Sequence, residues 1–217
     1  EEFPAYGFLA EEERPEGAPE RPDASHRWII DPIDGTTNFA HSLSPYAVSI
    51  GLEDRTSNEM VVGVVLDVSR GELFTAIRGK GFYVNGVRSR VSSESSLSES
   101  LLTTGFPFKE FTYVDEYLAT FKKFLHDAQG VRRPGVASID LAYVACGRFE
   151  GFFEIGLSPW DVAAGAVLVE EAGGHITDMQ GRTGNLFNGR ICASNGHVHD
   201  AMLSRLELLR GASSTAG

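Results

Sequence analysis

The pattern of apolar and polar positions changes character near the middle of the chain. In the first half, runs of β-branched and aromatic residues are separated by Gly, Asn or Ser, which predicts an antiparallel meander of strands. The runs are WII at 28–30, YAVSIGLE at 46–53, EMVVGVVLDV at 59–68, GELFTAI at 71–77 and FYVNGVRSRV at 82–91. The first strand is expected to end at Asp31, and Asn85-Gly86 is a strong signal for a hairpin in the last run.

The second half alternates helical and strand-like patterns. Helical spacing of apolar residues predicts helices over 111–128, 138–149, 158–174 and 197–210, with strands at 151–156, 175–179 and 190–195. The helix over 158–174 is the clearest, because Ser158 suits the cap, Pro159 the first helical position and Gly173 the end. Strands in one half and alternating units in the other predict layered sheets and helices, a mixed α/β (α+β) fold.

The chain of 217 residues fits a single unit over 1–217. We divide it into an antiparallel-sheet half (1–110) and an α/β half (111–210). Residues 14–27, rich in Pro, Glu and Arg, predict an exposed loop, and 36–41 predict a short turn or helix. The small polar residues of 211–217 predict a disordered tail.

Composition narrows the class of protein. The net charge of −11, from 30 acidic and 19 basic residues, argues against a nucleic-acid-binding surface. No apolar run is long enough to span a membrane, and the N-terminal residues lack the features of a signal peptide. Two cysteines are too few for a disulfide framework, so the expected location is the cytoplasm.

The stretch WIIDPIDGTTNF at 28–39 places two carboxylates, Asp31 and Asp34, at the end of an apolar strand. Like charges this close repel each other and resist losing water, so a positive group is expected between them. Pro32 stiffens the backbone that joins them, and the carbonyl of Ile33 offers a further oxygen. Mg²⁺ prefers such oxygen-only ligands. The same residues also fit a plain turn followed by a helix cap, and the stretch by itself leaves both open.

Other residues are candidates for the same site. Gly35 would let the backbone approach a ligand, a helix starting at Thr36 would offer free N–H groups to an anion, and the Thr36 hydroxyl could position a water. Asp161 fits a capping box with Ser158, although an acid in the first helical turn could also hold a metal. Glu11 and Glu12 could add carboxylates; an acidic triplet is otherwise a solvated face.

Together these segments resemble the inositol monophosphatase family of lithium-sensitive, Mg²⁺-dependent phosphomonoesterases. The likeness lies in GFLAEE at 7–12, DPIDGTTNF at 31–39 and PWDVAAGAVLVEEAGG at 159–174. TAIRGKGFYVNG at 75–86 and RRPGVASIDLAYVACGRFEGFFEIG at 132–156 add to it. The resemblance runs through nearly the whole chain, in the right order.

The resemblance implies a role for each matching residue. It implies two or three Mg²⁺ ions bound mainly by the first half of the chain, through Glu11, Glu12, Asp31, the Ile33 carbonyl and Asp34, together with Asp161 from the second half. It implies a catalytic set of Glu11, Asp31, Asp34, Thr36 and Asp161. It also implies that the substrate contacts Gly35, Thr36, Gly135, Val136, Ala137, Glu154 and Asp161, several of them in the second half of the chain.

The activity implied is hydrolysis of a small phosphate monoester, with myo-inositol monophosphate the leading candidate, by metal-activated water in a homodimer. Histidinol phosphate or fructose bisphosphate on the same metal core are alternatives. Arg132 and Arg133 could meet a second phosphate or a dimer partner, or could be solvated. A haloacid-dehalogenase-type phosphatase, suggested by DPIDGT, would instead form an aspartyl phosphate. A non-catalytic regulatory binding protein with the same fold is a third possibility.

The chain departs from the family pattern at its start. The family has an α-β-α-β-α sandwich of the sugar-phosphatase type, whose N-terminal helix pair carries an Asp that helps to activate water. That pair precedes the strand at 7–10 and is missing here, so we expect a truncated sequence. Ala10 stands where the family has glycine.

Overall fold

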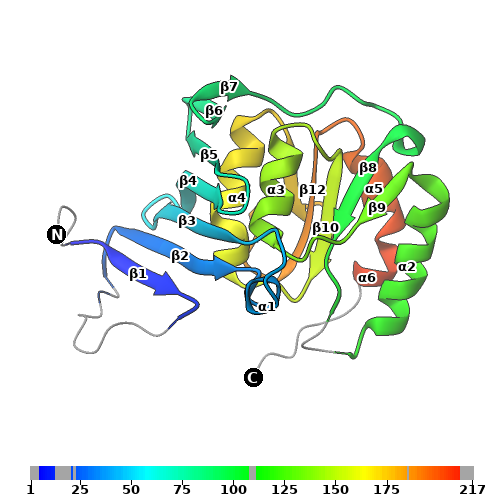
Figure 1. Ribbon diagram of the computed structural model, residues 1–217, viewed down its shortest axis with the longest axis horizontal. Helices are drawn as coiled ribbons and strands as arrows, with labels where there is room; N and C mark the ends of the chain where they lie inside the picture. Colours follow the sequence, from blue (N-terminus) through cyan, green and yellow to red (C-terminus); the bar gives the residue numbers. More distant parts are fainter. Residues whose placement is uncertain (1–4, 13–20, 22, 108–110, 185, 211–217) are drawn as a thin grey trace.

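The structure is a computed structural model that describes residues 5–12, 21, 23–107, 111–184 and 186–210. Figure 1 shows four layers: a seven-stranded sheet, the helices α3 and α4, a five-stranded sheet, and the helices α2, α5 and α6. The predicted mixed α/β fold of layered sheets and helices is confirmed. Among the described residues, no helix is long and apolar enough to cross a bilayer. The tail over 211–217 and most of the predicted loop over 14–27 lie outside the described residues.

The first sheet is the expected meander. Its strands follow chain order and are antiparallel, apart from β1, which is parallel to β2. They are β1 Gly7–Ala10, β2 His26–Asp34, β3 Ala47–Asp54, β4 Glu59–Asp67, β5 Glu72–Ile77, β6 Gly81–Val84 and β7 Val87–Ser89. The hairpin at Asn85-Gly86 is confirmed, with positive φ at both residues.

The end of β2 differs from the prediction. The strand continues beyond Asp31 to Asp34, with an irregular register between the two residues, and Asp34 pairs with Ala47 of β3. The short helix α1, Thr36–Ala40, follows directly. Both aspartates are therefore anchored in the sheet, on either side of the irregularity.

The second sheet is mixed, in the order β11-β12-β10-β8-β9. Its strands are β8 Leu101–Thr104, β9 Gly130–Arg132, β10 Gly151–Ile155, β11 His175–Asp178 and β12 Arg190–Ser194. The pattern did not predict β8 and β9, which are only four and three residues long. They pair in parallel with each other, and β8 also pairs with the distant β10. Such strands depend on partners that a local pattern does not contain.

The helices match the predicted positions with shorter bounds. They are α2 Val114–Asp127, α3 Ala137–Ala145, α4 Pro159–Glu171, α5 His199–Arg205 and α6 Glu207–Arg210, with a 3₁₀ turn at Leu97–Glu99. The helix predicted over 197–210 is wrong as a single element, because it is interrupted at Leu206. The helix predicted to reach 149 ends at Ala145, and Gly147 just beyond has a φ of +77°.

Glycines bring α4 very close to both of its neighbours. A Cβ on Gly63 of β4 would lie 2.4 Å from the carbonyl oxygen of Ala164, and a Cβ on Gly165 would lie 2.4 Å from the Leu141 side chain of α3. Helix α4 therefore lies deep between the first sheet and α3, and eight of its residues are buried. This close packing places the start of α4, with Asp161, beside the end of β2.

Candidate functional site

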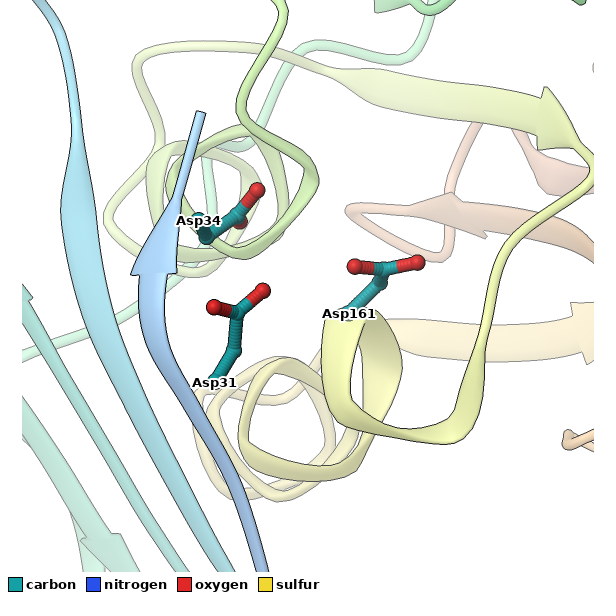
Figure 2. Close-up of side chains that lie close together, drawn as sticks. All are labelled: Asp31, Asp34 and Asp161. Carbon is teal, nitrogen blue, oxygen red and sulfur yellow. The ribbon is translucent and has the colours of Figure 1, made fainter. Parts of the chain in front are cut away.

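Three carboxylates from two distant segments meet at the end of β2. Oxygens of Asp31, Asp34 and Asp161 all lie within 4.8 Å of one another. Figure 2 shows the three side chains converging on one space, Asp31 and Asp34 from β2 and Asp161 from the first turn of α4. The two segments are more than a hundred residues apart in the chain, so only the tertiary structure brings the carboxylates together.

The electrostatics of this cluster favour a bound cation. Asp31 and Asp34 are buried, with 1% and 7% exposure. Burial, followed by the charges of Asp34 and Glu11, raises the pKa of Asp31 to about 8, and burial also raises the pKa of Asp34. Asp31 therefore stays ionised at neutral pH only if positive charge compensates it, and the same positive charge would oppose the raised pKa of Asp34. A divalent ion that prefers oxygen ligands fits this donor set.

Backbone groups fix the two strand aspartates. The Ile33 N–H donates to Asp31 Oδ1 at 2.9 Å, across Pro32. The Ser138 N–H, in the first turn of α3, donates to Asp34 Oδ2 at 2.8 Å. Asp34 therefore belongs to the carboxylate cluster and also links the first sheet to α3.

Asp161 combines both of the roles considered for it. Its Oδ2 accepts the Ser158 N–H at 2.7 Å, which completes a capping box at the start of α4. The same carboxylate belongs to the three-residue cluster. Capping holds the side chain at the helix start and so orients it toward the strand aspartates.

The structure does not bring Glu11 and Glu12 into this cluster. Both are exposed and directly follow β1. The Glu11 N–H donates to the Ile30 carbonyl at 3.2 Å, so its backbone lies beside β2 just before Asp31. The charge of Glu11 contributes to the raised pKa of both Asp31 and Asp34. Glu11 is thus near the cluster, and its role as a ligand stays a prediction.

The turn after β2 joins three of the predicted residues. The Thr36 hydroxyl donates to the Ile33 carbonyl oxygen at 3.0 Å, so these two groups are hydrogen-bonded to each other. Gly35 has a φ of +89°, and a Cβ there would lie 2.7 Å from Val136 Cγ2. Only glycine fits this position, between the turn and the loop that precedes α3. Helix α1 has only five residues, so its dipole is small. For binding an anion, its free backbone N–H groups therefore matter more than the dipole does.

A cavity of about 620 Å³ opens beside the carboxylates. Its wall includes the predicted residues Asp34, Gly135, Ala137, Glu154 and Asp161, whereas Val136 packs against Gly35. Burial, followed by the charges of Asp161 and Asp34, raises the pKa of Glu154 to about 8. A Cβ on Gly105 would collide with the Glu154 carboxylate at 1.9 Å, so glycine makes room for this side chain.

The two arginines of the RRPG segment separate in the structure. Arg133 lines the cavity and lies over the ring of Phe106, 5.4 Å from its centroid, and its charge counteracts the raised pKa of Glu154. Arg132 is exposed at the end of β9 and lines a different hollow. Of these two arginines, only Arg133 lines the main cavity.

Sequence reasoning missed two residues near the site, Asp140 and Arg190. Asp140 of α3 is fully buried; its Oδ1 accepts the Thr103 hydroxyl at 2.8 Å, and within the described residues its Oδ2 has no hydrogen-bond partner. Burial raises its pKa well above the ordinary value. An acid inside the apolar SIDLAYVA helix was a visible signal. Arg190 begins β12 and lines the cavity, and no sequence pattern distinguishes it.

Comparison with known proteins agrees with this fold and shows the family. Residues 1–209 match the inositol monophosphatase family. Inositol-1-monophosphatase of Mesorhizobium japonicum is 43% identical over 204 residues, covering 94% of this chain and 75% of that protein. Nus factor SuhB of Escherichia coli K12 is 45% identical over 204 residues, covering 94% of this chain and 74% of that protein.

Solved structures give the same result. Inositol monophosphatase from Anabaena (Nostoc) sp. PCC 7120 superimposes with a TM-score of 0.85 at 42% identity, covering 95% of this chain and 80% of that one. The extragenic suppressor protein suhB from Bartonella henselae gives a TM-score of 0.87 at 40% identity, covering 97% and 80%. These matches place the protein among phosphatases, and the chain belongs to the inositol monophosphatase family. Membership of this family sets aside the haloacid-dehalogenase-type alternative.

Proposed function

We propose that this protein hydrolyses a phosphate monoester with the help of Mg²⁺, and that its substrate is an inositol monophosphate. The observation that carries the proposal is the cluster of Asp31, Asp34 and Asp161 at the mouth of a cavity that also contains Glu154. Carboxylates that repel one another without a cation suit a metal site, and a buried carboxylate in a cavity suits a substrate rich in hydroxyl groups.

The residues divide between the metals and the phosphate. Asp31, Asp34 and Asp161 would hold two or three Mg²⁺ ions, with Glu11, Glu12 and the Ile33 carbonyl as the further ligands implied by the family. When bound, Mg²⁺ lowers the pKa of water and neutralises charge on the phosphate. The Thr36 hydroxyl, which donates to the Ile33 carbonyl at 3.0 Å, would orient a water at the end of the turn.

The remaining residues position the ester. Backbone N–H groups of Gly35 and Thr36 would hold the phosphate, since they open the short helix α1. Glu154 would accept hydrogen bonds from hydroxyl groups of the leaving group, and Gly135, Val136 and Ala137 would line its path. In-line attack on phosphorus then requires positioning and charge neutralisation, with no covalent enzyme intermediate.

Other attributes follow from the family alone. We propose a homodimer in the cytoplasm whose activity Li⁺ inhibits. Histidinol phosphate and fructose 1,6-bisphosphate remain alternative substrates for the same metal core. Several relatives about 45% identical are named Nus factor SuhB, a name that describes those proteins. It keeps open the alternative of a regulatory binding protein, which turnover measurements distinguish from an enzyme.

The decisive test is phosphate release with and without the Asp34 charge. Asp34→Asn keeps a side-chain oxygen for the Ser138 N–H while removing one negative charge from the cluster. We expect Mg²⁺-dependent release from inositol 1-phosphate by the wild type, and a loss of at least about 100-fold in kcat/KM with weaker Mg²⁺ binding in the variant. Asp54→Asn, at the end of β3 and outside the cavity wall, is the matched control. An Asp34→Asn protein with unchanged Mg²⁺ titration would overturn the proposal.

A further inference from the structure

The cavity beside the carboxylates extends well past Glu154 to a second group of residues. Its far wall contains Tyr113, Asn188, Gly189 and Arg190. The Arg190 guanidinium lies over the Tyr113 ring, 4.9 Å from the centroid, and its Nη1 donates to the Leu209 carbonyl at 2.7 Å. This positive group is thus held in place by α6 on one side and by an aromatic ring on the other.

The register of the second sheet shows that the two ends of the cavity lie on opposite faces. In the pairing of β10 with β12, Glu154 is opposite Ile191, and Ile155 is opposite Arg190. Paired residues share a face and neighbours along a strand alternate. Glu154 therefore projects toward α3 and α4, whereas Arg190 projects toward the layer of α2, α5 and α6 (Figure 1). The cavity connects the two by passing around the end of β10, where Gly156 and Leu157 line it.

The two ends of the cavity also differ in charge. The near end holds three carboxylates, Asp34, Glu154 and Asp161, together with one cation, Arg133, whose charge counteracts the raised pKa of Glu154. At the far end Arg190 is 8% exposed, and among the described residues it forms no ion pair with a carboxylate. Burial of a charge is costly unless an opposite charge compensates it. A buried guanidinium on a cavity wall therefore has the chemistry of a receptor for an anion.

We propose that the far end of the cavity binds a second phosphate carried by the leaving group of the substrate, with Arg190 as the residue that selects for it. The proposal rests on the proposed function and extends its substrate class from monophosphates to polyols or sugars that carry a second phosphate. The ester at the carboxylate end is the one hydrolysed, and the distal phosphate is bound and left intact. Arginine suits this task because its planar guanidinium stays charged and binds phosphate through two parallel hydrogen bonds.

The test compares inositol 1-phosphate with inositol 1,4-bisphosphate and fructose 1,6-bisphosphate. We expect the wild type to show a higher kcat/KM for at least one of the bisphosphates. Arg190→Gln should lower that value about 10- to 100-fold, mainly through KM, and change the value for the monophosphate less than about 2-fold. Arg190→Lys keeps the charge but loses the planar fork, so it should retain only part of the preference.

A matched control addresses the structural role of Arg190. Arg205→Gln also removes a contact between helices, the 2.7 Å ion pair of Arg205 with Asp127. Arg205 lies outside the cavity wall. This substitution should leave the preference unchanged. Equal losses for monophosphate and bisphosphate in Arg190→Gln, or a wild type without preference for either bisphosphate, would overturn the inference.

Binding without turnover separates this inference from the proposed function. In EDTA, the melting temperature should rise more with fructose 1,6-bisphosphate than with fructose 6-phosphate, and Arg190→Gln should abolish the difference. Inorganic sulfate at the same concentration tests whether any free anion suffices, which would contradict a substrate subsite. If no ester is hydrolysed with Mg²⁺ but the difference in melting temperature persists, the proposed function fails and the anion site stands. If an ester is hydrolysed but the melting temperatures do not differ, the anion site alone is rejected.

Discussion

Several buried or partly buried polar side chains in this protein form hydrogen bonds that also fix their orientation. Asp161 is the clearest case. Its carboxylate accepts a hydrogen bond from the Ser158 N–H, and this bond also orients the carboxylate toward Asp31 and Asp34. His199 is a second case, remote from the cavity. Its Nε2 lies 2.9 Å from the Thr177 hydroxyl and its Nδ1 lies 3.0 Å from the Ser194 hydroxyl.

His199 should make stability depend on pH. Burial, helped by the charge of His175 and opposed by that of Asp200, lowers its pKa to about 4. The unfolded histidine, with a pKa of about 6.5, therefore binds a proton first as the pH falls, and stability decreases from pH 6.5 toward pH 4. We expect His199 to account for about 2 kcal/mol of the unfolding free energy lost between pH 7 and pH 5.

Urea unfolding at the two pH values measures this contribution. In His199→Gln the loss between pH 7 and pH 5 should be smaller than in the wild type by that amount. His197→Gln, at an exposed neighbouring position, should behave like the wild type. An identical pH dependence in His199→Gln and the wild type would contradict the prediction.

Among the elements, α4 connects the packing of the molecule to its chemistry. One side of the helix lies against the first sheet, where Gly63 contacts the backbone at Ala164, and another lies against α3 through Gly165. The first turn of the same helix carries Asp161. A displacement of α4 should therefore affect both stability and the carboxylate cluster.

Gly63→Ala tests this coupling. The new methyl group would lie 2.4 Å from a carbonyl oxygen, so the helix must move away from the sheet. We expect a loss of about 1–3 kcal/mol in unfolding free energy, together with weaker Mg²⁺ binding. Gly184→Ala, where nothing lies within 4 Å of the added Cβ, is the matched control. A destabilised Gly63→Ala protein with unchanged Mg²⁺ affinity would show that α4 packing and the cluster are independent.

In the molecule as a whole, the repulsion among the clustered carboxylates adds to the self-repulsion of a protein with a net charge of −11. The first sheet supplies Asp31 and Asp34, and the helical layer between the sheets supplies Asp161. Folding brings these like charges together, so a bound cation should stabilise the folded state more than the unfolded chain.

Divalent ions should therefore raise the melting temperature. Mg²⁺ at 100 times its dissociation constant would add about 2.7 kcal/mol, or roughly 5–10 °C for a domain of this size. NaCl at equal ionic strength should have a much smaller effect, and EDTA should reverse the increase. An equal response to NaCl and Mg²⁺, or a full response in Asp34→Asn, would indicate that the ion acts elsewhere.

Much of the fold and part of the site could be predicted. The strands of the first sheet and α4 have local signals, namely apolar runs, Asn85-Gly86, and Ser158 with Pro159. Strands β8 and β9 have none, because they are short and are stabilised by distant partners. The division into halves at residue 110 and the roles of the individual site residues remain predictions.

The family and the order of most elements can be read from the sequence, since both depend on neighbouring residues and on motifs in a fixed order. The meeting of Asp161 with the strand aspartates, the position of Glu11 and Glu12 outside that cluster, and the cavity that Arg190 shares with Glu154 are visible only in the folded protein. The physical reason is that burial and charge proximity arise from the packing of distant segments. No local pattern encodes that packing.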